Sequence, residues 1–318
     1  MRSPLLVAIL TAIGCAERSE GTACMPVETA ECPAPEDVDL ADLSDTSYCD
    51  HEVIEMVSTE TPEATPSLDT GTVECCYEVV EIDRSPNSEC MVGRPYVEDG
   101  ESVLPSHPFV GDRVTAAWIR LAAMEWASVA AFARLAMELM AHGAPADLVA
   151  RVTEAMRDEV DHAERLRTHA ERRSCRALPY GPMPFPHPVA VRRDLATLAA
   201  EAVREGCIGE TLSAELVAEA ARQAEDRVVA TDLAKIAADE RRHAVLSWAV
   251  VAWAIREGGA PVRHAVRDAF ADPAPVGVMT RADGNEADGL LGPTACAAVV
   301  ERTLMDVIVP AAKALQAA

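Results

Sequence analysis

The sequence is poor in aromatic residues and in basic residues. Aromatic side chains make up only 4% of the 318 residues, while Ala, Leu and Val abound. This composition favours helices packed through small aliphatic side chains over an all-β sandwich. A net charge of −24, with no Lys/Arg run to offset it, would repel a phosphate backbone, so we expect no nucleic-acid partner. Hydrophobic residues, at 49%, are sufficient for a sizeable core.

The opening apolar run is too short for a membrane span, which needs roughly 20 residues. Leu5–Ile13 follows Arg2 and is separated from Cys15 by one small residue, a pattern typical of an export signal. It resembles the lipobox of bacterial lipoproteins, whose cysteine is lipidated, although Ala12 stands where that motif usually has Leu. We therefore expect a signal peptide over residues 1–14, a lipid site at Cys15, and a protein exported to the bacterial cell envelope and held at the membrane by its lipid only. Cleavage by the ordinary signal peptidase is the alternative.

Acidic residues and cysteines are concentrated ahead of residue 111. Residues 16–110 contain 23 acidic side chains against three arginines, and seven of the ten cysteines lie within the first 90 residues. If Cys15 is lipidated, six cysteines remain in this segment. They predict up to three disulfides that staple a small module with little apolar surface to bury. The sequence contains no Cys-x-x-Cys pair, so a metal knuckle is not favoured.

The acidic segment is expected to be rich in loops. Residues 58–72 are polar and interrupted by proline, whereas residues 72–82 show the β-branched, alternating pattern of a strand. We predict a small Cys-rich fold of loops with one hairpin. The predicted domains are the signal peptide, the acidic Cys-rich segment over residues 15–110, and a helical domain over residues 111–318.

Helical periodicity dominates the rest of the chain. Glycine and proline divide it into segments, and the Pro-rich stretch 174–188 predicts a long crossover without helix. Four long helices would form one bundle over residues 114–257, followed by two extra C-terminal helices within residues 262–314. The predicted helices span residues 114–142, 146–173, 191–224, 226–257, 262–270 and 294–314.

Carboxylates interrupt the apolar faces of the four bundle helices. Stepping through each helix by 3.6 residues places six polar side chains on the inward faces: Glu125, Glu159, His162, Glu210, Glu240 and His243. An ionised carboxylate buried without a partner costs several kcal/mol, and a shared cation would remove that cost. A small error in the phase of the third helix would replace Glu210 by Glu205 as the inward residue.

The order and spacing of these residues resemble the ferritin-like superfamily. Two helices with one Glu each and two with Glu-x-x-His form the ligand set of its di-iron and di-manganese bundles. DERRH at residues 239–243 matches the family's Asp-Glu-x-Arg-His form, and DEVDH at residues 158–162 departs from it at Asp161. MEWASVAAFARL and REGCIGETL are also similar to exported bacterial ferritin-like proteins with a Cys-rich segment ahead of the bundle. The resemblance implies a mainly α fold, a ferritin-like four-helix bundle and two bound Fe ions, with Mn as the alternative.

Three further residues are predicted to act next to the metals. Asp158 and Asp239 each lie one turn before the His of their own helix, where a hydrogen bond would orient the imidazole. Cys207 lies one turn before the ligand of the third helix and would tune, ligate or be oxidised by the centre; packing in a tight helix contact is the alternative. A disulfide between Cys175 and Cys296 would leave Cys207 as the remaining thiol.

A di-iron centre of this type implies an oxidoreductase that consumes O2 or peroxide, or oxidises Fe(II). The four tyrosines (Tyr48, Tyr77, Tyr96 and Tyr180) lie outside the predicted bundle helices, which disfavours a tyrosyl radical. No rubredoxin-type cysteine pairs are present, so an external electron donor is needed. The alternatives are a cell-envelope binding or structural lipoprotein with the bundle as scaffold, and a di-iron oxygenase of unknown substrate.

Overall fold

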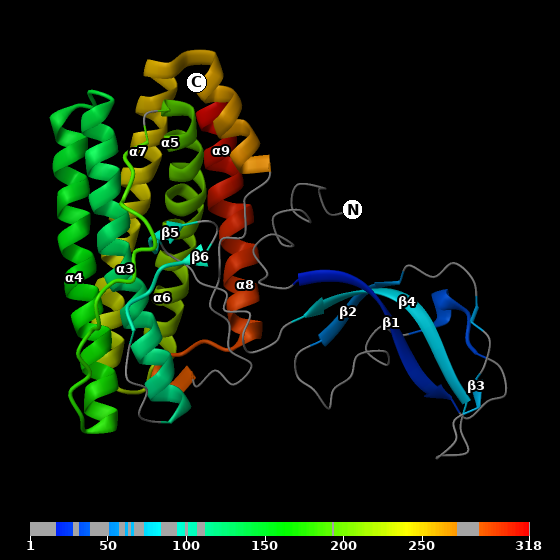
Figure 1. Ribbon diagram of the computed structural model, residues 1–318. Helices are drawn as coiled ribbons and strands as arrows, with labels where there is room; N and C mark the ends of the chain where they lie inside the picture. Colours follow the sequence, from blue (N-terminus) through cyan, green and yellow to red (C-terminus); the bar gives the residue numbers. More distant parts are fainter. Residues whose placement is uncertain are drawn as a thin grey trace. The chain divides into compact units, whose positions relative to one another are not determined.

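Long helices make up most of the described chain (Figure 1), so the predicted mainly helical fold class is confirmed. The contacts divide the described residues into two units: a strand unit within Gly14–Glu89 and a helical unit within Cys90–Ala318. The predicted signal peptide and Cys15 lie outside the described residues. The computed structural model describes residues 17–27, 32–38, 51–56, 61–62, 65–66, 73–83, 94–98, 101–106, 112–192, 194–271 and 286–317.

The first unit is built around one antiparallel sheet. Its strands are β1 (Glu17–Val27), β2 (His51–Met56), β3 (Thr65–Pro66) and β4 (Val73–Asp83), and a short 3-10 helix, η1, spans Pro35–Asp37. The strand expected over residues 72–82 is confirmed as β4. The expected hairpin is present as the antiparallel pair β3–β4. The structure adds β1 on one edge of β4 and β2 on the other, so the hairpin is part of a larger sheet. These two strands come from more distant parts of the chain, which local turn signals do not detect.

A disulfide fastens the sheet to the segment that follows β1. Cys32 and Cys75 are bonded, with their Cα atoms 5.6 Å apart, and Cys76 is disulfide-bonded as well. Tyr77 is fully buried on β4, and its hydroxyl donates to the carbonyl oxygen of Pro33 at 2.8 Å. The predicted stapling by disulfides is therefore confirmed for these cysteines.

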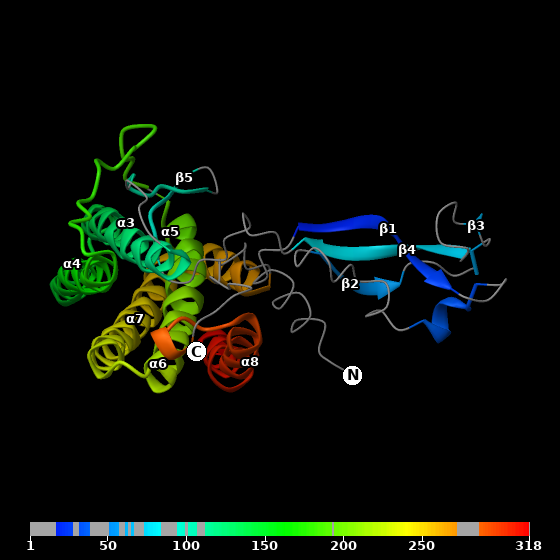
Figure 2. The same cartoon turned by 90° about the horizontal axis from the view of Figure 1, so that it is seen from below.

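The second unit contains rods that lie side by side around a common interior (Figure 2). Three of the rods are the helices α3 (Arg113–Ala141), α4 (Ala146–Ser174) and α7 (Arg227–Ala271). The remaining rod, third in chain order, consists of α5 (Leu195–Glu201), the π-helix η2 (Ala202–Glu210) and α6 (Thr211–Gln223), which follow one another without a break. The described residues between α4 and α5 contain no helix, as expected for the crossover. Fully buried Leu135, Leu212 and Ile236 belong to the aliphatic core.

Local signals place the ends of the helices. The Asp112 carboxylate accepts a hydrogen bond from the Thr115 N–H at 2.9 Å and caps α3. Asp194 caps α5 in the same way, through Thr197 N–H at 3.1 Å. The helix α7 is interrupted at Gly259, whose φ of +62° is costly for any other residue. The break separates the two segments that were expected at 226–257 and 262–270.

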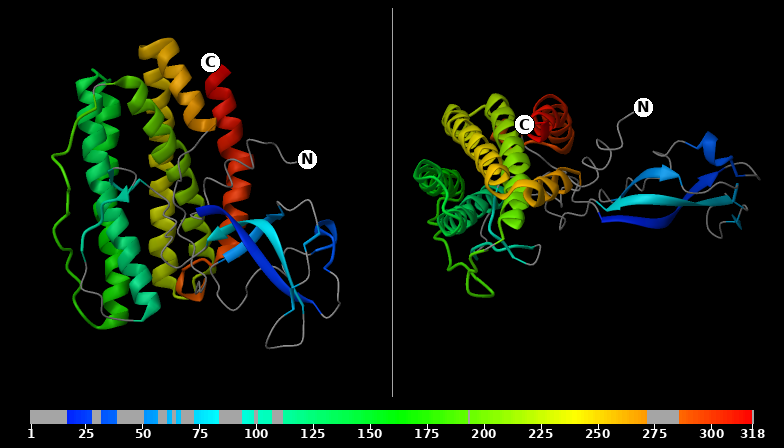
Figure 3. Two further views of the ribbon diagram at one scale, coloured as in Figure 1. Left: turned by 45° about the vertical axis from the view of Figure 1, so that its right-hand side comes forward. Right: turned by 90° about the horizontal axis from the view of Figure 1, so that it is seen from above.

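The C-terminal helices pack outside the rods, against α6 and α7 (Figure 3). They follow a short 3-10 helix, η3 (Glu286–Asp288), and comprise α8 (Pro293–Thr303), the π-helix η4 (Leu304–Ile308) and α9 (Val309–Ala317). Leu304 and Ile308 are fully buried. No helix in the described part of the chain has the length and hydropathy of a membrane span.

A strap, residues 94–98 and 101–106, lies across α3. It contains the hairpin of β5 (Val97–Glu98) and β6 (Glu101–Ser102). Tyr96 and Val103 pack on Ala127 and Ala131 of α3. The sequence assigned these residues to the acidic segment, but in the structure they belong to the helical unit because α3 buries their apolar side chains.

Candidate metal centre

Two overlapping groups of Glu and His side chains lie inside the rods. The first group is Glu125, Glu159, His162 and Glu240, and the second is Glu210, Glu240 and His243. Within each group, one ligand-type atom per residue lies within 4.8 Å of all the others. Glu125 is 15% exposed, and the other five side chains are at most 2% exposed. The structure thus brings all six predicted ligand candidates together, whereas Glu205 is in neither group.

Glu159 and Glu240 lie between the two imidazoles. The two carboxylate oxygens of Glu159 are 3.0 Å from Nδ1 of His243 and 3.7 Å from Nδ1 of His162. Those of Glu240 are 3.3 Å from Nδ1 of His162 and 3.5 Å from Nδ1 of His243. Glu125 approaches only the His162 side, at 3.6 Å. Glu159 and Glu240 therefore each contact both imidazoles, whereas Glu125 lies on the side of His162 and Glu210 on the side of His243.

Five ligand-type atoms of the cluster lack a hydrogen-bond partner in the described structure. They are Glu159 Oε2, His162 Nδ1, Glu210 Oε1, Glu240 Oε2 and His243 Nδ1. A buried polar atom left without a partner costs about 1–3 kcal/mol, and native structures contain few of them. Five in one cluster are explained by a ligand that uses those atoms, and carboxylate oxygens with imidazole nitrogens are donors for a metal cation.

The pKa values show how the cluster compensates its charge without a cation. Burial raises the pKa of Glu125 and Glu210 well above the ordinary value for Glu. Burial acts in the same sense on Glu240, but the nearby imidazoles of His162 and His243 outweigh it and hold that pKa well below the usual range. A bound cation would displace the protons on this cluster, so its binding would release protons.

The outer nitrogen of each imidazole contacts an aspartate of the opposite helix. His162 Nε2 lies 3.2 Å from Asp239 Oδ2, and His243 Nε2 lies 3.4 Å from Asp158 Oδ2. Both aspartates that were predicted to orient an imidazole thus lie beside one. Each contacts the His of the other helix and not that of its own, because the imidazoles reach across between α4 and α7. When Nε2–H donates to the aspartate, the Nδ1 lone pair faces the cluster.

Cations surround these two aspartates. Arg242 contacts both, with Nη1 at 2.5 Å from Asp239 Oδ1 and Nη2 at 2.9 Å from Asp158 Oδ2. Lys235 joins Asp239 at 3.0 Å to Asp161 at 2.6 Å. Asp161, the departure from the family pattern, is thus neutralised by a lysine that the sequence analysis did not single out. Its position, four residues before Asp239 on the same helix, was the available signal.

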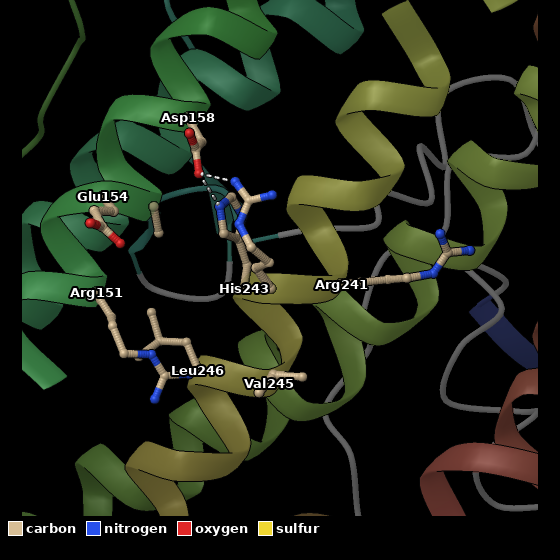
Figure 4. A pocket seen from close by; sticks show the side chains of 9 residues that line it. Arg151, Glu154, Asp158, Arg241, His243, Val245 and Leu246 are labelled. Carbon is tan, nitrogen blue, oxygen red and sulfur yellow. Dashed lines mark hydrogen bonds and ion pairs between the residues drawn. The ribbon is translucent and has the colours of Figure 1, made fainter. Parts of the chain in front are cut away.

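A pocket of about 330 Å³ opens between α4 and α7 (Figure 4). Its wall includes Arg151 and Leu246, and Asp158, Arg242 and His243 also line it. A dashed line in Figure 4 joins Asp158 to His243, and Asp158 also contacts Arg242. The pocket therefore lies against the outer edge of His243, which is itself buried and whose Nδ1 faces the cluster of carboxylates.

The described cysteines of the helical unit do not belong to the ligand cluster. Cys207 is fully buried, burial raises the pKa of its thiol, and neither metal-capable group of the described residues includes it. Cys175 is an exposed thiol and Cys296 a buried one, so the expected disulfide between them is not formed. This arrangement favours packing as the role of Cys207.

One tyrosine lies near the cluster although it is outside the helices. Tyr180 of the crossover stacks on Trp126, with ring centroids 4.6 Å apart, and Trp126 directly follows Glu125. The Tyr180 hydroxyl donates to the carbonyl oxygen of Ala163 at 2.8 Å. Sequence position alone did not reveal this proximity, because the crossover returns to α3.

Comparison with protein-family models, curated proteins and solved structures found no match for this chain. The geometry of the cluster therefore carries the functional argument.

Proposed function

We propose that this chain is a ferritin-like di-metal carboxylate protein, an oxidoreductase that reacts with O2, peroxide or Fe(II). The proposal is carried by one observation, the five buried ligand-type atoms without hydrogen-bond partners in the two overlapping groups. They belong to side chains from three different rods, and the remaining rod, α3, contributes Glu125. Such a set is stable in a folded interior when cations share it.

The charge of the cluster fits two divalent ions. Four carboxylates with neutral imidazoles carry four negative charges, which two divalent cations balance. Glu159 and Glu240 would be shared, Glu125 and His162 would hold one ion, and Glu210 and His243 the other. Mixed oxygen and imidazole ligands suit Fe, with Mn as the alternative.

Bound iron would supply redox chemistry toward O2, peroxide or Fe(II) as substrate, with electrons from an external donor. The chain itself fixes the ligands and excludes water. Asp158 and Asp239 hold the outer imidazole nitrogens. Fully buried Phe132 packs its ring edge-on at 5.3 Å from the ring of His243 and makes one wall of the site apolar.

We also propose that the protein acts in the bacterial cell envelope as an exported lipoprotein. The sequence over residues 1–15 supports export and lipidation. The disulfides in the strand unit support an oxidising compartment, since such bonds rarely persist in a reducing cytosol.

Anaerobic titration of the metal-free protein with Fe(II), followed by exposure to O2, tests the proposed function. We expect two equivalents of Fe(II) per chain and, after O2, the near-ultraviolet absorption of ferric carboxylate centres. Binding of zinc alone, or of no metal, would contradict the proposal.

A matched pair of variants on α4 sharpens this test. Glu159→Gln removes a shared carboxylate, whereas Glu154→Gln changes an exposed residue one turn earlier on the same helix. We expect Glu159→Gln to abolish binding of both ions and Glu154→Gln to bind them as the wild type does. A metal-free wild type whose stability is unchanged by Glu159→Gln would favour the scaffold alternative.

A further inference from the structure

Glu205, the alternative ligand of the third rod, is held between two arginines. Arg94 of the strap is 3% exposed, and its Nε lies 3.3 Å from Glu205 Oε2, an ion pair without the geometry of a hydrogen bond. Arg134 of α3 approaches Glu205 Oε1 with Nη2 at 3.5 Å, and its Nη1 donates to the carbonyl oxygen of Val97 at 3.3 Å. Both guanidinium groups are nearly removed from solvent, so the carboxylate is fixed against α3 and the strap.

Glu205 lies within the π-helix η2, a conformation that needs support from outside. π-Helices are rare and occur as single turns in which one extra residue is accommodated. If η2 relaxed to a regular α-helix, the residues beyond it would shift by one position, or about 100° around the axis. Glu210, the last residue of η2, would then turn away from His243. The register of η2 therefore decides whether this carboxylate reaches the cluster.

Arg94 fills the space between η2 and the wall of the site. Its guanidinium lies 5.2 Å from the centre of the Phe132 ring, which in turn packs against His243. A Cβ on Gly206 would lie 2.2 Å from Ser247 Oγ and 3.1 Å from Arg94 Nη1. η2 is therefore held by close contact on the α7 side and by Arg94 on the α3 side.

We propose that Arg94 and Arg134 are positioning residues that clamp Glu205 and so hold η2 in the register that presents Glu210 to the metal. The inference rests on the proposed function for the metal itself. The clamp also gives separate roles to two carboxylates that are five residues apart: Glu205 lies at the arginines and Glu210 is buried in the cluster.

Titration of the metal-free full chain with Co(II), followed by visible absorption, tests the clamp. We expect Arg94→Gln and Glu205→Gln to weaken the binding of one of two Co(II) ions by about tenfold or more, the usual effect of losing a residue that orients a ligand. Their absorption bands should change as they do in Glu210→Gln. Arg222→Gln is the control, because Arg222 forms its ion pair with Glu219 of its own helix, α6, and we expect it to bind both ions normally.

Amide hydrogen exchange of residues 202–210 in the metal-free protein separates the clamp from the metal. We expect faster exchange in Arg94→Gln than in Arg222→Gln, and an intermediate rate in Arg94→Lys, which keeps the charge but not the forked geometry. Unchanged exchange together with wild-type Co(II) binding in the Arg94 variants would overturn the proposal. If the wild type binds no Co(II), the proposed function is contradicted. If residues 202–210 nevertheless exchange faster in Arg94→Gln than in the control, the clamp remains supported.

Discussion

The two units of the chain keep their folds by different means. In the strand unit, described acidic residues such as Asp37 and Glu78 are exposed, and a disulfide joins Cys32 to β4. In the helical unit, long aliphatic rods enclose a core, and four glutamates lie together inside it. The comparison teaches that exposed carboxylates are stabilised by water, so a unit rich in them needs only disulfides to replace a large core. Buried carboxylates have lost that water, and their charge must be compensated inside the protein.

The disulfide and the bound cation stabilise their units through different states of the chain. A disulfide acts mainly by restricting the unfolded chain. A bound cation acts on the folded state only, by mass action. The two units should therefore respond to different reagents, and each of the following experiments tests that separation.

Removal of metal should have the largest effect, and only on the helical unit. Each ion present at about a thousand times its Kd stabilises the fold by about 4 kcal/mol. We expect a chelator to lower the Tm of the helical unit and to leave the strand unit unchanged, as followed by calorimetry and by amide exchange of α4 and β4. Equal shifts in both units would break the comparison.

Loss of the Cys32–Cys75 disulfide should destabilise the strand unit and leave the helical unit unchanged. The bond joins residues separated by 43 positions, and the chain-entropy relation gives a stabilisation of about 4 kcal/mol for a loop of this length. We expect the double variant Cys32→Ser, Cys75→Ser to expose β4 to amide exchange while α4 stays protected. Cys175→Ser, at an exposed thiol, is the control and should change neither unit.

Gly206→Ala should destabilise the helical unit by a smaller amount. The new methyl group would overlap Ser247, so η2 and α7 must move apart, at a cost of about 1–3 kcal/mol. Urea unfolding measures the loss, and Ser247→Gly in the same chain should restore part of it. A variant as stable as the wild type would show that the two elements have more freedom here than the structure implies.

The cap of α3 gives the smallest predicted effect, and one that depends on pH. Asp112→Ala should cost about 1 kcal/mol. The backbone N–H and hydroxyl of Thr115, with Arg173, lower the pKa of Asp112 to about 2. Because the folded pKa lies below the unfolded value of about 3.9, this stabilisation is present above about pH 4 and fades as pH falls toward 2.

Comparing urea unfolding of Asp112→Ala and Asp112→Asn across this pH range measures the effect. Asn keeps a capping oxygen that does not titrate, so its stability should lack this pH dependence. A wild-type protein with the same pH profile as Asp112→Asn would contradict the assigned pKa.

Much of the fold could be predicted because helical periodicity is local. The ends of α3 and α4 and the break at Gly259 follow from caps, glycine and proline in the immediate sequence. The burial of Glu159 and Glu240 follows from the apolar residues spaced around them. The strap was assigned to the wrong region, because its few apolar side chains show no period and are buried only by α3.

The candidate site divides in the same way. The spacing of Glu and His along each helix determined which six side chains lie inward, since a helix places residues three and four apart on one face. Only the tertiary structure decided which atoms meet: the exchange of aspartate partners between α4 and α7, the separate placements of Glu205 and Glu210, and the insertion of Arg94. Those contacts join residues far apart in the chain, and their geometry depends on how the rods pack, which no local period encodes.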